Sequence, residues 1–192
     1  MPLTMEEKSI LIQIARKSIE AKLDDKKIEL HIDPAKFAIL KSKSGVFVTL
    51  KINDQLRGCI GYITTDEPLY KTIQEAASHA AFEDPRFPPL QKSEYDEVEL
   101  EISVLSEPYP MKDYDEIVIG EHGLILEENG QRGLLLPQVP VEHGMTKEQY
   151  LDSICRKTGI PQDTWKKKKL NMYLFTAEVF DEKEPEAEDG IS

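Results

Sequence analysis

The stretch VFVTLKINDQLRGCIG, residues 46–61, has the pattern of two β-strands joined by a tight turn. Apolar and polar residues alternate from Val46 to Ile52, as in a strand with one buried face. A second strand is expected to start near Leu56, after the turn residues Asn53-Asp54-Gln55. The segment therefore predicts an antiparallel hairpin around which the rest of the chain is organised.

The length of the turn decides which side chains share a face of this hairpin. A two-residue loop would place Arg57 and Cys59 on the apolar face. A three-residue loop instead places Leu56 and Ile60 there, with Asp54 in the left-handed conformation, so we expect the longer loop. The less apolar face would then carry Phe47, Thr49, Arg57, Cys59 and Gly61.

Capping signals and helical spacing predict three helices. Thr4-Met5-Glu6-Glu7 is a capping box that opens an amphipathic helix over residues 5–23. Pro68 lies in the first turn of a second helix, which has a face of small residues. Thr146-Lys147-Glu148-Gln149 is a second capping box, and Gly159 ends the helix that it opens.

The remaining segments predict further strands. Residues 98–106 alternate in polarity and have one solvated face, which is typical of an antiparallel or edge strand. Residues 173–180 (YLFTAEVF) predict a final strand. Asn129-Gly130 is the strongest hairpin signal in the sequence. Pro137 and Pro140 predict an extended connector between them.

Composition limits the classes of function. The 192 residues include 36 acidic and 24 basic ones, a net charge of −12, which argues against nucleic acid as the main partner. No apolar run is long enough to span a bilayer, and MPLTMEEKS does not resemble a signal peptide. Two cysteines without CxxC spacing indicate free thiols in a reducing cytoplasm. The acidic residues 182–192 predict a disordered tail.

Cys59 is the first candidate for chemistry. A cation such as Arg57 would lower the pKa of the thiol and favour the reactive thiolate. A nucleophilic cysteine also needs a base, and His79 lies in the helix that follows the Cys59 strand. The alternative is that Cys59 is a small buried hydrophobic residue.

Two arginines are candidates for binding an anion. Arg57 and Arg86 could hold a carboxylate or phosphate through bidentate hydrogen bonds, and the proline-rich loop over residues 84–90 would hold Arg86 stiffly. The alternative is salt bridges to the many carboxylates, for instance Glu83 or Glu99.

Gly58 and Gly61 complete the predicted binding segment, and we expect Gly61 to leave open space beside the sulfur. These glycines lack the spacing of a phosphate loop, and the histidines lack metal-ligand spacing, so no metal or cofactor is predicted. Lys166–Lys169 beside Trp165 could contact RNA, but such a run more often forms a solvated surface.

Taken in order, several segments spread over roughly residues 5–180 resemble the AMMECR family. They are FVTLKINDQLRGCIG (47–61), AAFEDPRFPPL (80–90), LEISVLSEP (100–108), HGLIL and GLLLPQV within 122–139, the helix with Leu151 and Cys155, and FTAEVF (175–180). One departure is Asp54, where family members commonly carry glycine.

The resemblance implies an α+β fold, in which residues 1–181 form one domain: a larger lobe with an antiparallel sheet and flanking helices, and a small second lobe. It places the LRGCIG signature near a cleft between the lobes. In prokaryotes such domains are associated with Memo-type and radical-SAM proteins. Two hypotheses follow: an enzyme or substrate-binding component that takes a small anionic ligand at Cys59 and Arg57, or a non-catalytic adaptor that docks a partner protein or, less favoured by the charge, nucleic acid.

Overall fold

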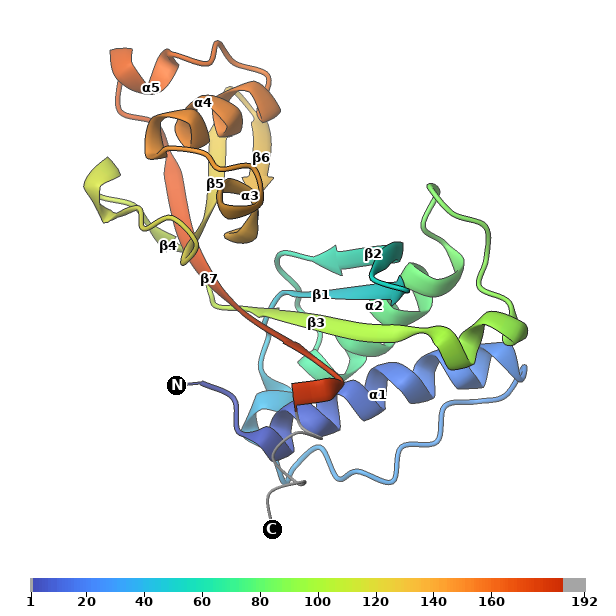
Figure 1. The fold of residues 1–192 in the computed structure, drawn as a ribbon. Coiled ribbons are helices and arrows are strands. Elements are labelled where there is room, and N and C mark those ends of the chain that lie inside the picture. Colours follow the sequence, from blue (N-terminus) through green and yellow to red (C-terminus); the bar gives the residue numbers. More distant parts are fainter. Residues whose placement is uncertain (1, 185–192) are drawn as a thin grey trace. The chain divides into compact units, whose positions relative to one another are not determined.

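A computed structural model describes residues 2–184 of the chain (Figure 1). The chain forms two compact units: Met1–Leu105 together with Glu178–Ser192, and Ser106–Ala177. The second unit is therefore inserted into the sequence of the first. Helices and antiparallel strands occur in both units, and the predicted α+β class is confirmed.

In the first unit, two long helices pack on an antiparallel sheet of order β2-β1-β3, with the end of β7 beside β3. Both helices lie on the same side of this sheet (Figure 1). The elements are α1 (Met5–Leu23), η1 (Ala38–Lys41), β1 (Val46–Ile52), β2 (Gln55–Tyr62), α2 (Leu69–Phe82), η2 (Lys92–Glu97), β3 (Glu99–Leu105) and the last residues of β7 (Met172–Asp181).

Helix α1 has the predicted bounds, because its capping box forms as expected. The backbone N–H of Glu7 donates to Thr4 Oγ1 at 3.1 Å, and the Glu7 carboxylate accepts from the Thr4 backbone N–H at 2.8 Å. Leu11, Ile14 and Ile19 are fully buried at helical spacing.

The small residues of α2 bring this helix close to the sheet. Ala76, Ala77 and Ala80 are buried, as the sequence predicts. A Cβ atom built on Gly58 would lie only 2.0 Å from the carbonyl oxygen of Ala80. Only a glycine in β2 therefore allows the backbones of helix and strand to approach this closely.

The turn of the hairpin is shorter than predicted. Ile52 pairs with Gln55, so the loop holds two residues, Asn53 and Asp54, and the predicted three-residue loop is wrong. Their φ angles are +51° and +60°, the left-handed conformations that a type I′ turn requires. Asp54 thus takes the predicted conformation in a different turn.

A β-bulge at Arg57 reconciles the short turn with the expected pairing of the apolar residues. Leu50 pairs with Gly58 while Lys51 pairs with Leu56, so Arg57 is an extra residue without a partner in β1. The register beyond Gly58 is the predicted one. Leu56, however, does not join the core and is 43% exposed, because the bulge moves it to the other face.

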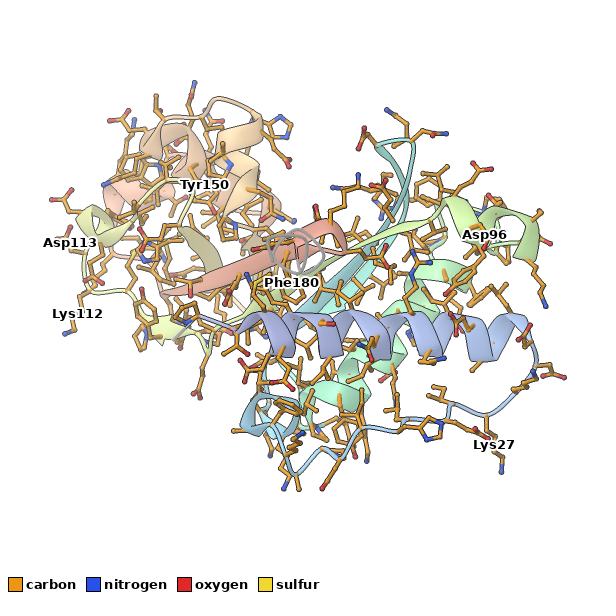
Figure 2. The ribbon with its side chains drawn as sticks, turned by 60° about the horizontal axis from the view of Figure 1, so that its bottom comes forward. Lys27, Asp96, Lys112, Asp113, Tyr150 and Phe180 are labelled. Carbon is orange, nitrogen blue, oxygen red and sulfur yellow. The ribbon has the colours of Figure 1, made fainter. Side chains whose placement is uncertain are left out.

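The second unit is a sheet of order β6-β5-β7-β4 with short helices packed on it. Tyr150, labelled in Figure 2, is fully buried in its core. The elements are β4 (Tyr109–Pro110), η3 (Tyr114–Glu116), β5 (His122–Glu128), β6 (Gln131–Leu135), α3 (Gln138–Glu142), α4 (Lys147–Lys157), α5 (Thr164–Lys167) and the first part of β7.

Two local predictions hold in this unit and one is wrong. Asn129 and Gly130 form the predicted two-residue turn, and the capping box at Thr146 opens α4. Pro137 and Pro140 do not form an extended connector, since Pro137 caps the short helix α3 and Pro140 lies in its first turn. Prolines are tolerated there because the first N–H groups of a helix have no partner within it.

The stretch predicted to be a disordered tail begins inside the first unit. The Glu182 carboxylate accepts hydrogen bonds from Arg16 Nε at 2.5 Å and Nη2 at 2.7 Å, and from the backbone N–H of Leu100 at 3.0 Å. Glu182 therefore belongs to the first unit, because its charge is paired there. Residues 185–192 of the predicted tail lie outside the described residues.

No helix within residues 2–184 combines the length and the apolar character needed to cross a membrane.

Candidate anion-binding site around Cys59

Cys59 lies in β2, in a row of side chains that crosses the sheet. Its partner in β1 is Thr49, which in turn pairs with Glu101 in β3. The Thr49 hydroxyl donates to Cys59 Sγ at 3.2 Å, and the cysteine is half-buried. The predicted face with Thr49 and Cys59 together is thus present.

The environment makes the thiol a weak acid. Burial raises the pKa of Cys59; the Thr49 hydroxyl and the Arg86 charge act in the opposite direction but do not cancel it. The sequence predicts that a nearby cation, Arg57, lowers this pKa. The net effect is the reverse, so the thiol is protonated at neutral pH.

A buried carboxylate anchors the backbone of Cys59. Asp84 Oδ2 accepts the Cys59 N–H at 2.9 Å, and the same carboxylate accepts from Arg86 Nε at 3.0 Å and Nη2 at 2.8 Å. Arg86 Nη2 also donates to the Cys59 carbonyl at 3.3 Å. The bonds from Arg86 hold the pKa of Asp84 far below its usual range. One carboxylate thus fixes both the strand and the guanidinium.

The local sequence explains why Arg86 is held in this way. Asp84 Oδ1 accepts the backbone N–H of Arg86 at 3.1 Å, the Asx turn that aspartate favours, and Pro85 fixes the backbone between them. The backbone N–H of Leu90 donates to the carbonyl of Ala81 at 2.8 Å, which returns the loop to the end of α2.

Arg57 is engaged with a different carboxylate. Its guanidinium donates to both oxygens of Glu94, at 3.0 and 3.1 Å, and its side chain is only 12% exposed. The ring centroid of Phe87 lies 6.0 Å from the Arg57 guanidinium and 5.6 Å from that of Arg86. Both arginines therefore lie near the same aromatic ring, and each pairs with a carboxylate of its own. These carboxylates are Glu94 for Arg57 and Asp84 for Arg86, and not the Glu83 or Glu99 suggested from the sequence.

The glycines of the segment have packing roles. Gly58 lies against α2, as described above. At Gly61, a Cβ atom would lie 2.5 Å from the ring of Phe47. The open space expected beside the sulfur at Gly61 is therefore absent, because the ring fills it.

His79 lies in α2 with partners of its own. Its Nδ1 is 2.8 Å from the hydroxyl of Tyr62, and its Nε2 is 3.4 Å from a carboxylate oxygen of Glu83. Among the described residues no hydrogen bond connects His79 to Cys59. The predicted pairing of Cys59 with His79 is therefore absent among these bonds, and the roles of the predicted site residues remain predictions.

Within residues 2–184, no three His, Cys, Asp or Glu side chains gather closely enough to hold a metal ion.

The comparison with known families defines the class of protein to which the chain belongs. The AMMECR1 family model matches residues 12–180, and the chain is a member of that family, as its sequence predicts.

Among its relatives, a protein of Methanopyrus kandleri is 44% identical over 194 residues, covering 96% of this chain and 92% of the relative. One of Methanocaldococcus jannaschii is 42% identical over 194 residues, covering 97% and 95%. The crystal structure of an uncharacterized protein from Pyrococcus horikoshii is similar with a TM-score of 0.78 and 40% identity, covering 91% of this chain and 90% of that one.

Proposed function

We propose that the chain binds a small anionic ligand at Arg86, beside Cys59, as an enzyme or as the substrate-binding component of one. The supporting observation is that the Arg86 side chain is 56% exposed although a buried carboxylate anchors it. Its Nε and Nη2 are used internally, whereas Nη1 makes no hydrogen bond among the described residues. A fixed guanidinium with free donors suits a carboxylate or phosphate.

The ligand is expected to bind weakly by itself. Asp84 neutralises much of the guanidinium charge, so the ligand gains hydrogen bonds more than net attraction. We expect a Kd of about 0.1–1 mM for inorganic phosphate or malonate. Tighter binding requires a ligand that makes further contacts with residues around Arg86 and Cys59.

Calorimetric titration with phosphate and malonate tests this site. Arg86→Gln should abolish the measurable heat, because it removes the free donors. Arg132→Gln is a matched control, since Arg132 is an exposed arginine paired with Glu127 in the second unit. Equal binding by both variants would refute the proposed site.

The role of Cys59 is tested by alkylation with iodoacetamide across pH. From the burial of the thiol, we expect an apparent pKa above the ordinary value of about 8.5 and slow reaction at neutral pH. Such a thiol contacts the ligand as a neutral group. An apparent pKa well below that value would instead support a nucleophile, and Cys59→Ala identifies the reaction of Cys155, which is buried.

A cytoplasmic location and a shared pathway with Memo-type and radical-SAM proteins are part of this proposal. Two free cysteines are consistent with a reducing compartment. Co-purification of the full chain with such proteins, lost in Arg86→Gln, would support a shared substrate. Stoichiometric capture of a partner that Arg86→Gln and Cys59→Ala both retain would favour the adaptor alternative.

A further inference from the structure

The second unit has a hollow of about 370 Å³ that the site around Cys59 does not use. The segment after β4 and the residues of α5 and its C-terminal extension line it, and all of them belong to the second unit. Figure 2 labels Lys112 and Asp113 on the first of these segments. The lining residues that matter here are Lys112, Tyr114, Trp165 and Lys166–Lys169.

The hollow is rich in positive charge. Five lysines and one carboxylate, that of Asp113, line it. Lys167 pairs with Asp163 at 2.9 Å and Lys168 with Glu128 at 3.0 Å. The other three lysines, Lys112, Lys166 and Lys169, are exposed and form no ion pair among the described residues. Three ammonium groups are therefore available to a ligand.

The positive charge of the hollow contrasts with the net negative charge of the whole chain. The second unit holds 9 of the 24 basic and 11 of the 36 acidic residues, a net charge of −2 against −12 for the whole sequence. Five of those nine basic residues line the hollow. The unit thus concentrates its positive charge in one place, which attracts anions locally.

An aromatic pair forms a wall of the hollow. The rings of Tyr114 and Trp165 meet edge to face, with centroids 5.6 Å apart and an interplanar angle of 79°. The Trp165 Nε1–H donates to Asp152 at 2.7 Å, which fixes the indole. Lys166 Nζ lies over the Trp165 ring, 5.2 Å from its centroid, so a cation is held beside this aromatic wall.

We propose that this hollow binds a small phosphorylated ligand with a flat ring, of the chemical class of nucleotides. Lysine ammonium groups bind phosphate oxygens, and planar bases pack on aromatic side chains. The volume lies at the lower end for small-molecule sites, which fits one nucleotide. The acidic charge of the whole chain repels a long polyanion but affects a single nucleotide much less.

Trp165 makes the test direct, because it is the only tryptophan in the sequence. Titration of the full chain with ATP should change its fluorescence saturably. Calorimetry with inorganic tripolyphosphate should give at least about fivefold weaker binding than ATP, because the stacking contribution is missing. Binding of the two with equal affinity would overturn the role of the aromatic wall.

Charge-matched variants locate the ligand. Lys166→Gln/Lys169→Gln should weaken ATP binding at least about tenfold, since two charge-assisted contacts are lost. Lys147→Gln/Lys157→Gln in α4 removes the same charge from residues outside the hollow and should change affinity less than about twofold. Thermal unfolding of both variants checks that they fold.

Three further results would overturn the proposal. One is the absence of a saturable response to ATP at millimolar concentration. Another is an equal loss of affinity in the two double variants, which would indicate non-specific attraction. The third is binding of a single-stranded RNA oligonucleotide without binding of ATP, which would make this surface an RNA contact. None of these outcomes depends on the site around Cys59.

Discussion

The carboxylate of Asp84 links a loop, a strand and a guanidinium, so its removal should cost more stability than removal of the guanidinium itself. We predict that Asp84→Ala lowers the free energy of unfolding of the first unit by about 2–4 kcal/mol. Asp84→Asn should lower it by about 1–2 kcal/mol, because one oxygen can still accept the Cys59 N–H. Arg86→Gln should cost about 1–2 kcal/mol, because it leaves the buried Asp84 carboxylate without its cation, although both backbone N–H groups still donate to that carboxylate.

These magnitudes come from the bonds that each change removes. Asp84→Ala leaves the N–H of Cys59 without its acceptor at 2.9 Å, at about 1–3 kcal/mol, and the N–H of Arg86 without its acceptor at 3.1 Å, at about 1 kcal/mol. The ion pair adds less than these two bonds together, because the Arg86 side chain is more than half exposed and water screens it.

Urea unfolding followed by far-ultraviolet circular dichroism measures these differences, since α1 and α2 give most of the helical signal of the first unit. Trp165 fluorescence, recorded in the same samples, reports the second unit and serves as an internal control. Hydrogen exchange of the Cys59 amide gives a local readout and should accelerate in Asp84→Ala.

The series also has a pH signature. Since the folded pKa of Asp84 lies below its unfolded value of about 3.9, its stabilisation is complete above pH ~4 and is lost as pH falls through the folded value. The difference between wild type and Asp84→Asn should therefore shrink below pH ~4, by up to about 1.4 kcal/mol per pH unit. A cost of Arg86→Gln equal to that of Asp84→Ala, or a difference independent of pH, would refute this reasoning.

Three further changes test the fold. Gly58→Ala should lower stability by at least about 2 kcal/mol in thermal unfolding, because its Cβ would meet the carbonyl of Ala80; a neutral result would mean that α2 is not so close. Asp54→Gly should raise stability by about 0.5 kcal/mol, since glycine adopts a φ of +60° without steric cost, and a lower melting temperature would contradict the type I′ turn. Glu182→Gln should cost about 1–3 kcal/mol in urea unfolding through its bonds to Arg16, whereas no loss would contradict the docking of this segment.

Local signals predicted most of the secondary structure. The capping box at Thr4 fixed the start of α1, and Asn129-Gly130 located the second hairpin, because each signal acts within a few residues. The first hairpin allowed two conflicting interpretations: a two-residue turn, and an alternation of apolar and polar residues that required a three-residue turn. A β-bulge at Arg57 allows both the two-residue turn and the expected apolar pairing. No single residue type predicts a bulge from the sequence.

The candidate site was predicted in part. Cys59 and Arg86 come together, but the carboxylate that joins them, Asp84, was not identified. Aspartate followed by proline is a turn signal that could have shown that this side chain folds back on its own loop. The partner of Arg57 could not be predicted, because any of 36 acidic residues could meet a long, flexible cation and only the tertiary fold selects Glu94.

The division of the chain also bears on its synthesis. The first unit needs Glu182, which binds Arg16 in α1, and Phe180, which is buried in the same core. Both leave the ribosome after every residue of the second unit, Ser106–Ala177. Domains commonly fold in the order in which they are made. The first unit therefore begins to be synthesised first but is completed last. The edge of its sheet beside β3 stays unpaired until the end of β7 has been synthesised.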